Sequence, residues 1–166
     1  MVSRQGGFTY LTALFVVAIL LGGLALTGEM WATAAKRQKE AELLFIGDQY
    51  RRAIGLYYEA TPGSVKRYPR SLEDLIKDPR QARIERYLRK LYPDPITGKT
   101  EWGFVKAGDG GIQGVHSLSE DKPAKLAGFL TRDAGFERAP KYADWLFVYA
   151  PAAVATREST TPPLRK

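Results

Sequence analysis

The chain of 166 residues contains no cysteine and a single histidine, His116. Without cysteine it forms no disulfide and no thiolate metal site, and one histidine cannot supply a site of several imidazoles. The glycine-rich phosphate motifs GxxxxGK(S/T) and GxGxxG are also missing. A lone histidine in a predicted strand is far more often structural than catalytic. We therefore expect no catalytic residue, no metal and no cofactor, and we do not expect an enzyme.

Charge is absent from a long stretch near the N-terminus. Between Gln5 and Gly28 the only ionisable group is the phenol of Tyr10, and residues 8–27 read FTYLTALFVVAILLGGLALT. A helix of this length spans about 30 Å, which is the thickness of a bilayer's hydrocarbon core. A helix that is apolar on every side is suited to lipid rather than to the surface of a small soluble domain. The sequence therefore predicts a transmembrane helix at residues 8–28.

Proline is missing as far as Thr61, and Pro62 and Gly63 then end the predicted helix. Beyond Glu29, apolar side chains recur at a spacing of three and four residues, which is typical of one face of an amphipathic helix. This apolar stripe comprises Leu43, Ile46, Tyr50, Ala53, Ile54 and Tyr57. We predict that the helix continues through residues 29–60 and packs the stripe against a globular domain.

Residues 61–155 predict a mixed α/β region that follows the long helix. Ser71 precedes an acid, Asp74, by three residues, as at a helix N-terminus, so we expect a short helix from Ser71 to about Asp78. Further helices are predicted at residues 81–91 and 124–130. The loop between Tyr92 and Pro95 contains two prolines and is expected to be extended.

Aromatic and β-branched residues predict three strands, at residues 101–106, 112–118 and 144–149, with a glycine-rich turn at residues 108–111. Residues 156–166 contain few apolar groups and predict a disordered tail. The expected fold class is α+β. A long N-terminal helix, transmembrane in its first half and amphipathic in its second, packs on a small antiparallel β-sheet.

The residues before the apolar stretch form a short polar leader. Residues 1–7 carry one positive side chain, Arg4, and end in two glycines directly before Phe8. A secretory signal peptide has its small residues after the apolar core, whereas here they precede it. A cut after Gly7 would therefore keep the apolar helix as the new N-terminus.

This arrangement resembles the N-terminus of the type IV pilin and type II secretion pseudopilin superfamily. The matching residues are GFTYLT, from Gly7 to Thr12, followed by the apolar run and the amphipathic helix. The stretches YPRSLEDLIKDPR, RYLRKLYPDPITGKTEWGFV and GIQGVHSLSEDKP also resemble globular regions of pseudopilin-like proteins. The resemblance implies a pilin-like fold, cleavage by a prepilin peptidase after Gly7 and methylation of Phe8. It implies other pseudopilins or pilins and an inner-membrane assembly platform as partners.

One residue departs from the pattern of that family. The family usually carries a glutamate as the fifth residue of the mature chain, where this chain has Thr12. In the family this carboxylate pairs with the terminal amine of a neighbouring subunit, so the resemblance gives Phe8 and Thr12 a role in assembly. Some minor pseudopilins at the filament tip also lack the glutamate, which favours a minor subunit. The absence of cysteine favours the pseudopilin branch, because many major pilins close a loop with a disulfide.

The net charge of +7 raises the question of nucleic-acid binding and of membrane orientation. The lysines and arginines are interleaved with acids and lack an aromatic stacking pattern, so we expect no nucleic-acid partner. Lys36, Arg37 and Lys39 follow the apolar stretch and only Arg4 precedes it, so the positive-inside rule alone favours a C-terminus in the cytoplasm. The resemblance implies the opposite: a single-pass inner-membrane protein with a cytoplasmic N-terminus and a periplasmic C-terminal domain.

These features favour a non-enzymatic pseudopilin subunit of a type II secretion (type IV pilus-like) system, held in membrane lipid and assembled into a short periplasmic filament. Two alternatives remain open. One is a type IV pilin for surface pili or DNA uptake, and the other is a simple membrane-anchored periplasmic binding domain or enzyme. The Gly7–Phe8 junction and the apolar stripe that follows the membrane segment favour a subunit that assembles into a filament. An ordinary membrane anchor requires neither feature.

Overall fold

The computed structural model describes residues 6–81 and 83–151, without the side chains of residues 6–8 and 20–30. The predicted tail at residues 156–166 and most of the predicted leader lie outside the described residues. The elements of this description are one long α-helix, three short 3-10 helices and three strands.

The chain divides into two compact units, residues 1–38 and residues 39–166. Helix α1, Gly6–Glu59, contributes residues to both units, and all the other described helices and strands belong to the second. Each unit is therefore described by itself, and the second is called the domain below.

Helix α1 begins and ends close to the predicted residues 8 and 60. No proline interrupts it, and Pro62 and Gly63 follow its end. Gly63 has a φ of 84°, a conformation that glycine adopts without steric cost. The predicted membrane segment at residues 8–28 includes side chains outside the described residues. Within the part of the chain that is described, no helix combines the length and the apolar character needed to cross a membrane.

The predicted apolar stripe of α1 is buried in the domain, which confirms this prediction. Each of its six side chains is at most 4% exposed. The stripe packs against buried side chains from the rest of the domain, namely Leu72, Leu75, Leu88, Trp102, Ile112, Val115, Phe136, Tyr142, Trp145 and Phe147. Because burial of one large apolar side chain contributes about 1.5–3 kcal/mol, this helix face contributes substantially to the stability of the domain.

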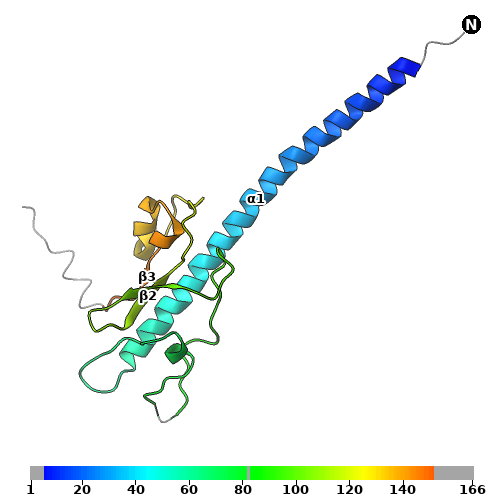
Figure 1. Ribbon diagram of the computed structural model, residues 1–166. Coiled ribbons are helices and arrows are strands. Elements are labelled where there is room, and N and C mark those ends of the chain that lie inside the picture. The colour runs from blue at the N-terminus through cyan, green and yellow to red at the C-terminus, as the bar shows by residue number, and fades with distance from the viewer. Residues whose placement is uncertain (1–5, 82, 152–166) are drawn as a thin grey trace, which may run out of the picture. The chain divides into compact units, whose positions relative to one another are not determined.

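Three short strands form one antiparallel sheet in the order β1-β2-β3. They are β1, Gly103–Lys106; β2, Ile112–His116; and β3, Phe147–Val148. Each strand lies inside a predicted one, so the α+β class with a small antiparallel sheet is confirmed at this level. In Figure 1 the sheet lies across the C-terminal part of α1.

The strands are shorter than predicted because the flanking residues form local hydrogen bonds. The 3-10 helix η3, Tyr142–Asp144, takes the start of the third predicted strand. After β2, the backbone N–H of Ser119 donates to the hydroxyl of Ser117 at 3.1 Å, which turns the chain away from the sheet. Side-chain hydroxyls of this kind offer the backbone an alternative to a strand ladder.

The helix predicted at residues 81–91 is wrong: residues 83–91 are irregular, and residue 82 lies outside the described residues. The backbone N–H groups of Tyr87 and Leu88 both donate to the carbonyl of Leu75, at 2.9 Å each, instead of to carbonyls within their own segment. The short helix expected from Ser71 is only the 3-10 helix η1, Glu73–Leu75, and no side chain caps it. Tertiary hydrogen bonds and packing therefore override the local helical pattern here.

The helix predicted at residues 124–130 is also wrong. Residues 124–130 form no helix, and the N–H groups of Ala124 and Lys125 donate to the side chain of Glu40, which attaches this segment to α1. The 3-10 helix η2, Thr131–Arg138, follows this segment and was not predicted. The missing helix and the unpredicted η2 have the same cause. Both segments are held by contacts with α1, which is distant from them in the sequence, and local sequence patterns do not report such contacts.

Two glycines of α1 allow the sheet to approach the helix closely. A Cβ atom placed on Gly47 would lie 2.4 Å from the ring of Phe147, and one placed on Gly55 would lie 2.7 Å from the ring of Tyr149. Real Cβ atoms do not come this close to other atoms, so both aromatic rings rest on helix backbone that carries no side chain. The position of β3 over α1 therefore depends on glycine at these two sites.

We predict that Gly47→Ala destabilises the domain, because the ring of Phe147 must move at a cost of about 1–3 kcal/mol. Alanine regains about 1 kcal/mol over glycine inside a helix, so the expected net loss is up to about 2 kcal/mol. Chemical unfolding of the full chain measures the difference. Gly135→Ala is the control, since a Cβ there meets no atom within 4 Å. Equal stability of Gly47→Ala and the wild type would show that the contact with Phe147 is not a tight one.

Candidate functional site

The residues predicted for processing and assembly lie in the first turns of α1. Gly7, Phe8 and Thr12 all belong to this helix, and the side chain of Thr12 is exposed. The side chain of Phe8 lies outside the described residues, so the structure gives no geometry for a Phe8–Thr12 contact.

The first unit carries a continuous exposed apolar surface. Between residues 10 and 19 its large apolar side chains are 49–69% exposed, namely Tyr10, Leu11, Leu14, Phe15, Val16, Val17 and Ile19. Contiguous exposed apolar surface of this kind marks a site of contact with a membrane or with another protein. This segment is the first candidate functional surface of the chain.

The single histidine has a packing role in the sheet. A ring nitrogen of His116, Nδ1, lies 2.8 Å from the carbonyl oxygen of Ser117. Its ring also covers Gly103, where a Cβ would come within 2.2 Å of it. Among the described residues, no three histidine or acidic side chains lie close enough together to hold a metal ion.

The domain contains a buried carboxylate that the sequence did not single out. Glu40 of α1 is 2% exposed. Its Oε1 accepts hydrogen bonds from the N–H groups of Ala124 and Lys125, at 2.6 and 3.2 Å, and from the hydroxyl of Tyr142 at 2.8 Å. Burial and then the hydrogen bond to Glu40 raise the pKa of Tyr142 well above its usual value. Glu40 precedes Leu43 by three residues and so continues the apolar stripe, which is the pattern that indicates its burial.

A second buried carboxylate, Asp78, fixes the chain beyond the end of α1. It binds Arg80 at 2.7 Å, and Arg80 in turn donates to the carbonyl of Tyr57 at 2.9 Å and lies 3.5 Å from the centre of the Tyr57 ring. The hydroxyl of Tyr87 also donates to Asp78, at 3.0 Å. Burial alone would raise the pKa of Asp78, but the hydrogen bonds from Arg80 and Tyr87 outweigh burial and hold this pKa below its usual value. The charge of Arg80 is therefore used inside the domain.

Two further acids complete these internal contacts. Asp94 is fully buried and accepts hydrogen bonds from the hydroxyls of Thr97 and Ser117, at 3.0 and 2.6 Å. Its backbone carbonyl accepts from Gly98, so residues 94–98 form a closed turn, and an aspartate followed by Pro95 and Gly98 is a sequence signal for such a turn. Asp133 binds Arg51 of α1 at 2.5 Å and attaches η2 to the helix.

Asp48 and Arg52, four residues apart on α1, form an ion pair. The Arg52 Nε atom lies 2.8 Å from Asp48 Oδ2. Arg132 also reaches Asp48, at 3.2 Å, so this exposed edge of the helix is bridged to η2. These contacts are structural and bring no reactive groups together.

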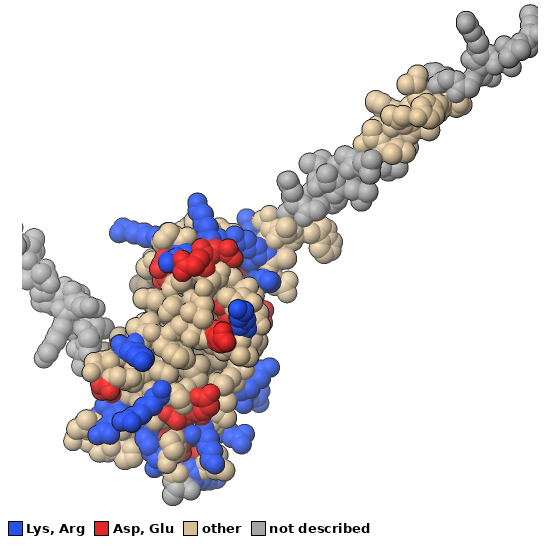
Figure 2. Space-filling view, in the orientation of Figure 1, with Lys and Arg blue, Asp and Glu red and all other residues tan. Residues whose placement is uncertain are grey.

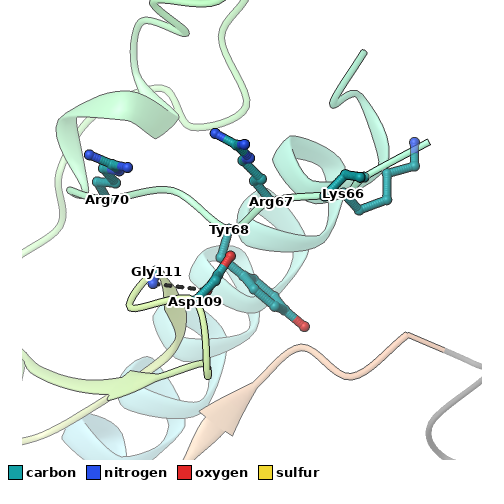
Figure 3. A pocket seen from close by; sticks show the side chains of 7 residues that line it. Lys66, Arg67, Tyr68, Arg70, Asp109 and Gly111 are labelled. Carbon is teal, nitrogen blue, oxygen red and sulfur yellow. Dashed lines mark hydrogen bonds between the residues drawn. The ribbon is translucent and has the colours of Figure 1, made fainter. Parts of the chain in front are cut away.

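A surface hollow of about 380 Å³ lies beside the end of α1, as Figure 3 shows. It is lined by Val65, Lys66, Arg67, Tyr68, Arg70, Asp109 and Gly111. The Lys66 ammonium donates to the carbonyls of Glu59 and Thr61, at 2.5 and 3.3 Å, and so binds the last carbonyls of the helix. Asp109 accepts from the N–H of Gly111 at 3.0 Å and closes the β1–β2 turn. These two charged groups are thus committed to the fold, and we assign no ligand to the hollow.

We predict that Glu40→Ala destabilises the domain by about 3 kcal/mol, because two backbone N–H groups and the buried hydroxyl of Tyr142 lose their acceptor. Amide hydrogen exchange at Ala124 and Lys125 should accelerate. Glu42→Ala is the matched control on an exposed position of the same helix, and its effect should stay within about 0.5 kcal/mol. An equally small effect of Glu40→Ala would show that residues 124–125 are held by other contacts.

Comparisons with known proteins add no assignment to these residues. No family model, no curated protein and no solved structure matches the chain.

Proposed function

We propose that this chain is a non-enzymatic pseudopilin subunit of a type II secretion (type IV pilus-like) system. It is inserted in the inner membrane, processed by a prepilin peptidase and assembled through its N-terminal helix into a short periplasmic filament as a minor subunit. The observation that carries this proposal is the division of α1 into two surfaces. Apolar side chains at residues 10–19 are exposed, and the apolar stripe from Leu43 to Tyr57 is buried in the core of a folded domain.

The exposed half of the helix requires a partner. Side chains such as Leu11 and Phe15 are about two-thirds exposed in the single chain, and water does not favour a helical surface of this kind. A membrane covers it while the subunit is stored, and other helices of the same type cover it in a filament. One helix can satisfy both environments because lipid tails and packed helices are similarly apolar.

The short leader supports processing of the N-terminus. Gly6 and Gly7 stand directly before the apolar segment, and no bulky side chain separates them from Phe8. Removal of residues 1–7 leaves the complete apolar segment at the new N-terminus, ready to enter a helix-packed core. The partners in this proposal are the peptidase, other pseudopilins or pilins, the assembly platform and lipid, with the domain in the periplasm.

Processing gives the first test. We predict that the protein isolated from cells containing a prepilin peptidase lacks Met1–Gly7 and begins with N-methylated Phe8, as read by intact mass and N-terminal sequencing. Gly7→Arg should block the cut, because a bulky charged side chain replaces the smallest residue beside the cleaved bond. Gly6→Ala is the control and should be cut. A mature protein that still begins at Met1 would refute processing and favour the membrane-anchored binding domain.

Thr12 gives the second test. The hydroxyl of Thr12 can accept a hydrogen bond but cannot neutralise a neighbour's terminal ammonium, and an unpaired charge in an apolar filament core is costly. We therefore predict that the wild type forms only small complexes when overproduced alone, and that Thr12→Glu gains filament formation, as seen by crosslinking and electron microscopy. Thr12→Gln is the uncharged control of the same size as glutamate. Long filaments of the wild type alone would contradict the assignment as a minor subunit.

A further inference from the structure

One irregular segment of the domain carries a concentration of exposed positive charge. Residues 83–90 contain Arg83, Arg86, Arg89 and Lys90, all of them exposed, with Glu85 as the single acid. In Figure 2, lysine and arginine side chains gather over the end of the domain where residues 70–90 lie in Figure 1. This segment is called the arginine segment below.

The arginine segment is fixed to the domain although it is not helical. Leu88 is 4% exposed and anchors the segment in the core. The N–H groups of Tyr87 and Leu88 bind the carbonyl of Leu75, and the carbonyl of Glu85 accepts from Asp78 at 3.2 Å. The hydroxyl of Tyr87 binds the same Asp78, which is itself tied to α1 through Arg80. The exposed arginines are thus presented from a backbone that is already in place, which lowers the ordering cost of binding.

The guanidinium groups of this segment are not used inside the domain. Unlike Arg80 and Arg51, the side chains of Arg83, Arg86 and Arg89 make no ion pair with any carboxylate in the described part of the chain. A hollow of about 350 Å³ lies at the centre of the segment, lined by Arg86, Tyr87, Leu88 and Arg89. A small acidic group that enters this hollow meets the side chains of Arg86 and Arg89, which line it.

The side chains of the segment point to carboxylates as the ligand. A guanidinium presents parallel N–H donors that bind a carboxylate in a bidentate manner. Ile84 is 61% exposed beside the arginines, which adds an apolar contact to the charged ones. Protein interfaces are enriched in arginine, and exposed apolar side chains surrounded by arginine are typical of them.

A nucleic acid fits these residues less well than a protein does. Single-stranded nucleic acid requires aromatic side chains on which bases stack. The two tyrosines near the segment are already occupied: the ring of Tyr87 packs edge-on against Tyr57, and that of Tyr92 packs edge-on against Tyr50. The side chain of Ile84 is apolar and has no hydrogen-bond donor for a phosphate group.

We propose that the arginine segment is a docking site for an acidic segment of a partner protein, in which carboxylates bind Arg86 and Arg89 and an apolar side chain contacts Ile84. The chain's own net charge of +7 disfavours a second copy of itself at this site, because like charges would face each other. That the partner is another, acidic subunit of the filament rests on the function proposed above. This partner would differ in sequence from the present chain, as expected for a minor subunit.

The test uses the full chain purified in detergent and two labelled probes. One is a short peptide with glutamates around a central leucine, and the other is a single-stranded DNA of the same net charge. Fluorescence anisotropy should show tighter binding of the peptide than of the DNA. Arg86→Glu with Arg89→Glu should weaken peptide binding by at least about tenfold, because two charge-assisted contacts become repulsive. Ile84→Ser should weaken it by a smaller factor.

The matched control is Lys99→Glu with Arg138→Glu, which makes the same change in net charge at two other exposed positions. It should change peptide binding by less than about twofold, because neither residue lines the hollow and exposed charges that do not touch the ligand are screened by physiological salt. Thermal unfolding of each variant confirms that the fold is retained. Equal weakening by both pairs, or no peptide binding by the wild type, would overturn the proposal. Tighter binding of the DNA would replace it with a nucleic-acid site.

Failure of this proposal is separable from failure of the proposed function. The binding assay requires neither cleavage at Gly7 nor filament assembly. If Phe8 is methylated but the peptide does not bind, the docking site is wrong and the pseudopilin assignment stands. If the peptide binds but the protein begins at Met1, the docking site is supported. The proposal that its partner is a filament subunit is then rejected.

Discussion

The domain depends on the burial of one face of α1. In the part of the chain that the structure describes, its sheet has three short strands, and packing against a helix stabilises so small a sheet. Aromatic rings fill the space between the two: Trp145 stacks on Phe136 with ring centroids 5.4 Å apart, and Phe147 rests on the bare backbone of Gly47. Such ring pairs contribute about 0.5–1.5 kcal/mol each beyond the area they bury. The helix that the proposed function places in a filament is therefore also the core of the domain.

Acidic side chains, more than strands, position the rest of the domain. Glu40 binds residues 124–125 and η3, Asp78 binds the region around Arg80, and Asp133 binds η2 to α1. Hydrogen bonds to a charged group are shorter and stronger than neutral ones, and breaking them inside a protein leaves costly unpaired groups. Each of these acids therefore fixes an irregular segment without regular backbone pairing. Arg83, Arg86 and Arg89 make no such ion pair in the described part of the chain, and they are exposed.

The sequence predicts what local patterns determine. A helical period of apolar residues and the absence of proline predict α1 and its stripe, and aromatic or β-branched runs predict the three strands, although not their ends. The helix at residues 81–91 fails because Leu88 is buried while Ile84 is exposed, and the decisive hydrogen bonds go to Leu75. Burial of Glu40 is missed because charged residues rarely lie in cores, even though its spacing places it on the stripe. The processing and assembly roles of Gly7, Phe8 and Thr12 are inferred from the resemblance. The structure gives no geometry for a contact between Phe8 and Thr12.

The arrangement of the buried acids has a consequence for the way the domain opens. Glu40 lies near the first residue of α1 that belongs to the domain, and Arg80 of the Asp78–Arg80 pair binds Tyr57 near the end of the helix. The segments that these acids hold are therefore attached at separate points. Separate attachment allows one segment to detach while the other keeps its hydrogen bonds, since the free energy of local opening is lower than that of global unfolding. The stripe and the sheet then remain folded as the most protected part. The domain is in this sense modular: a partner could rearrange one peripheral segment and leave the helix packing unchanged.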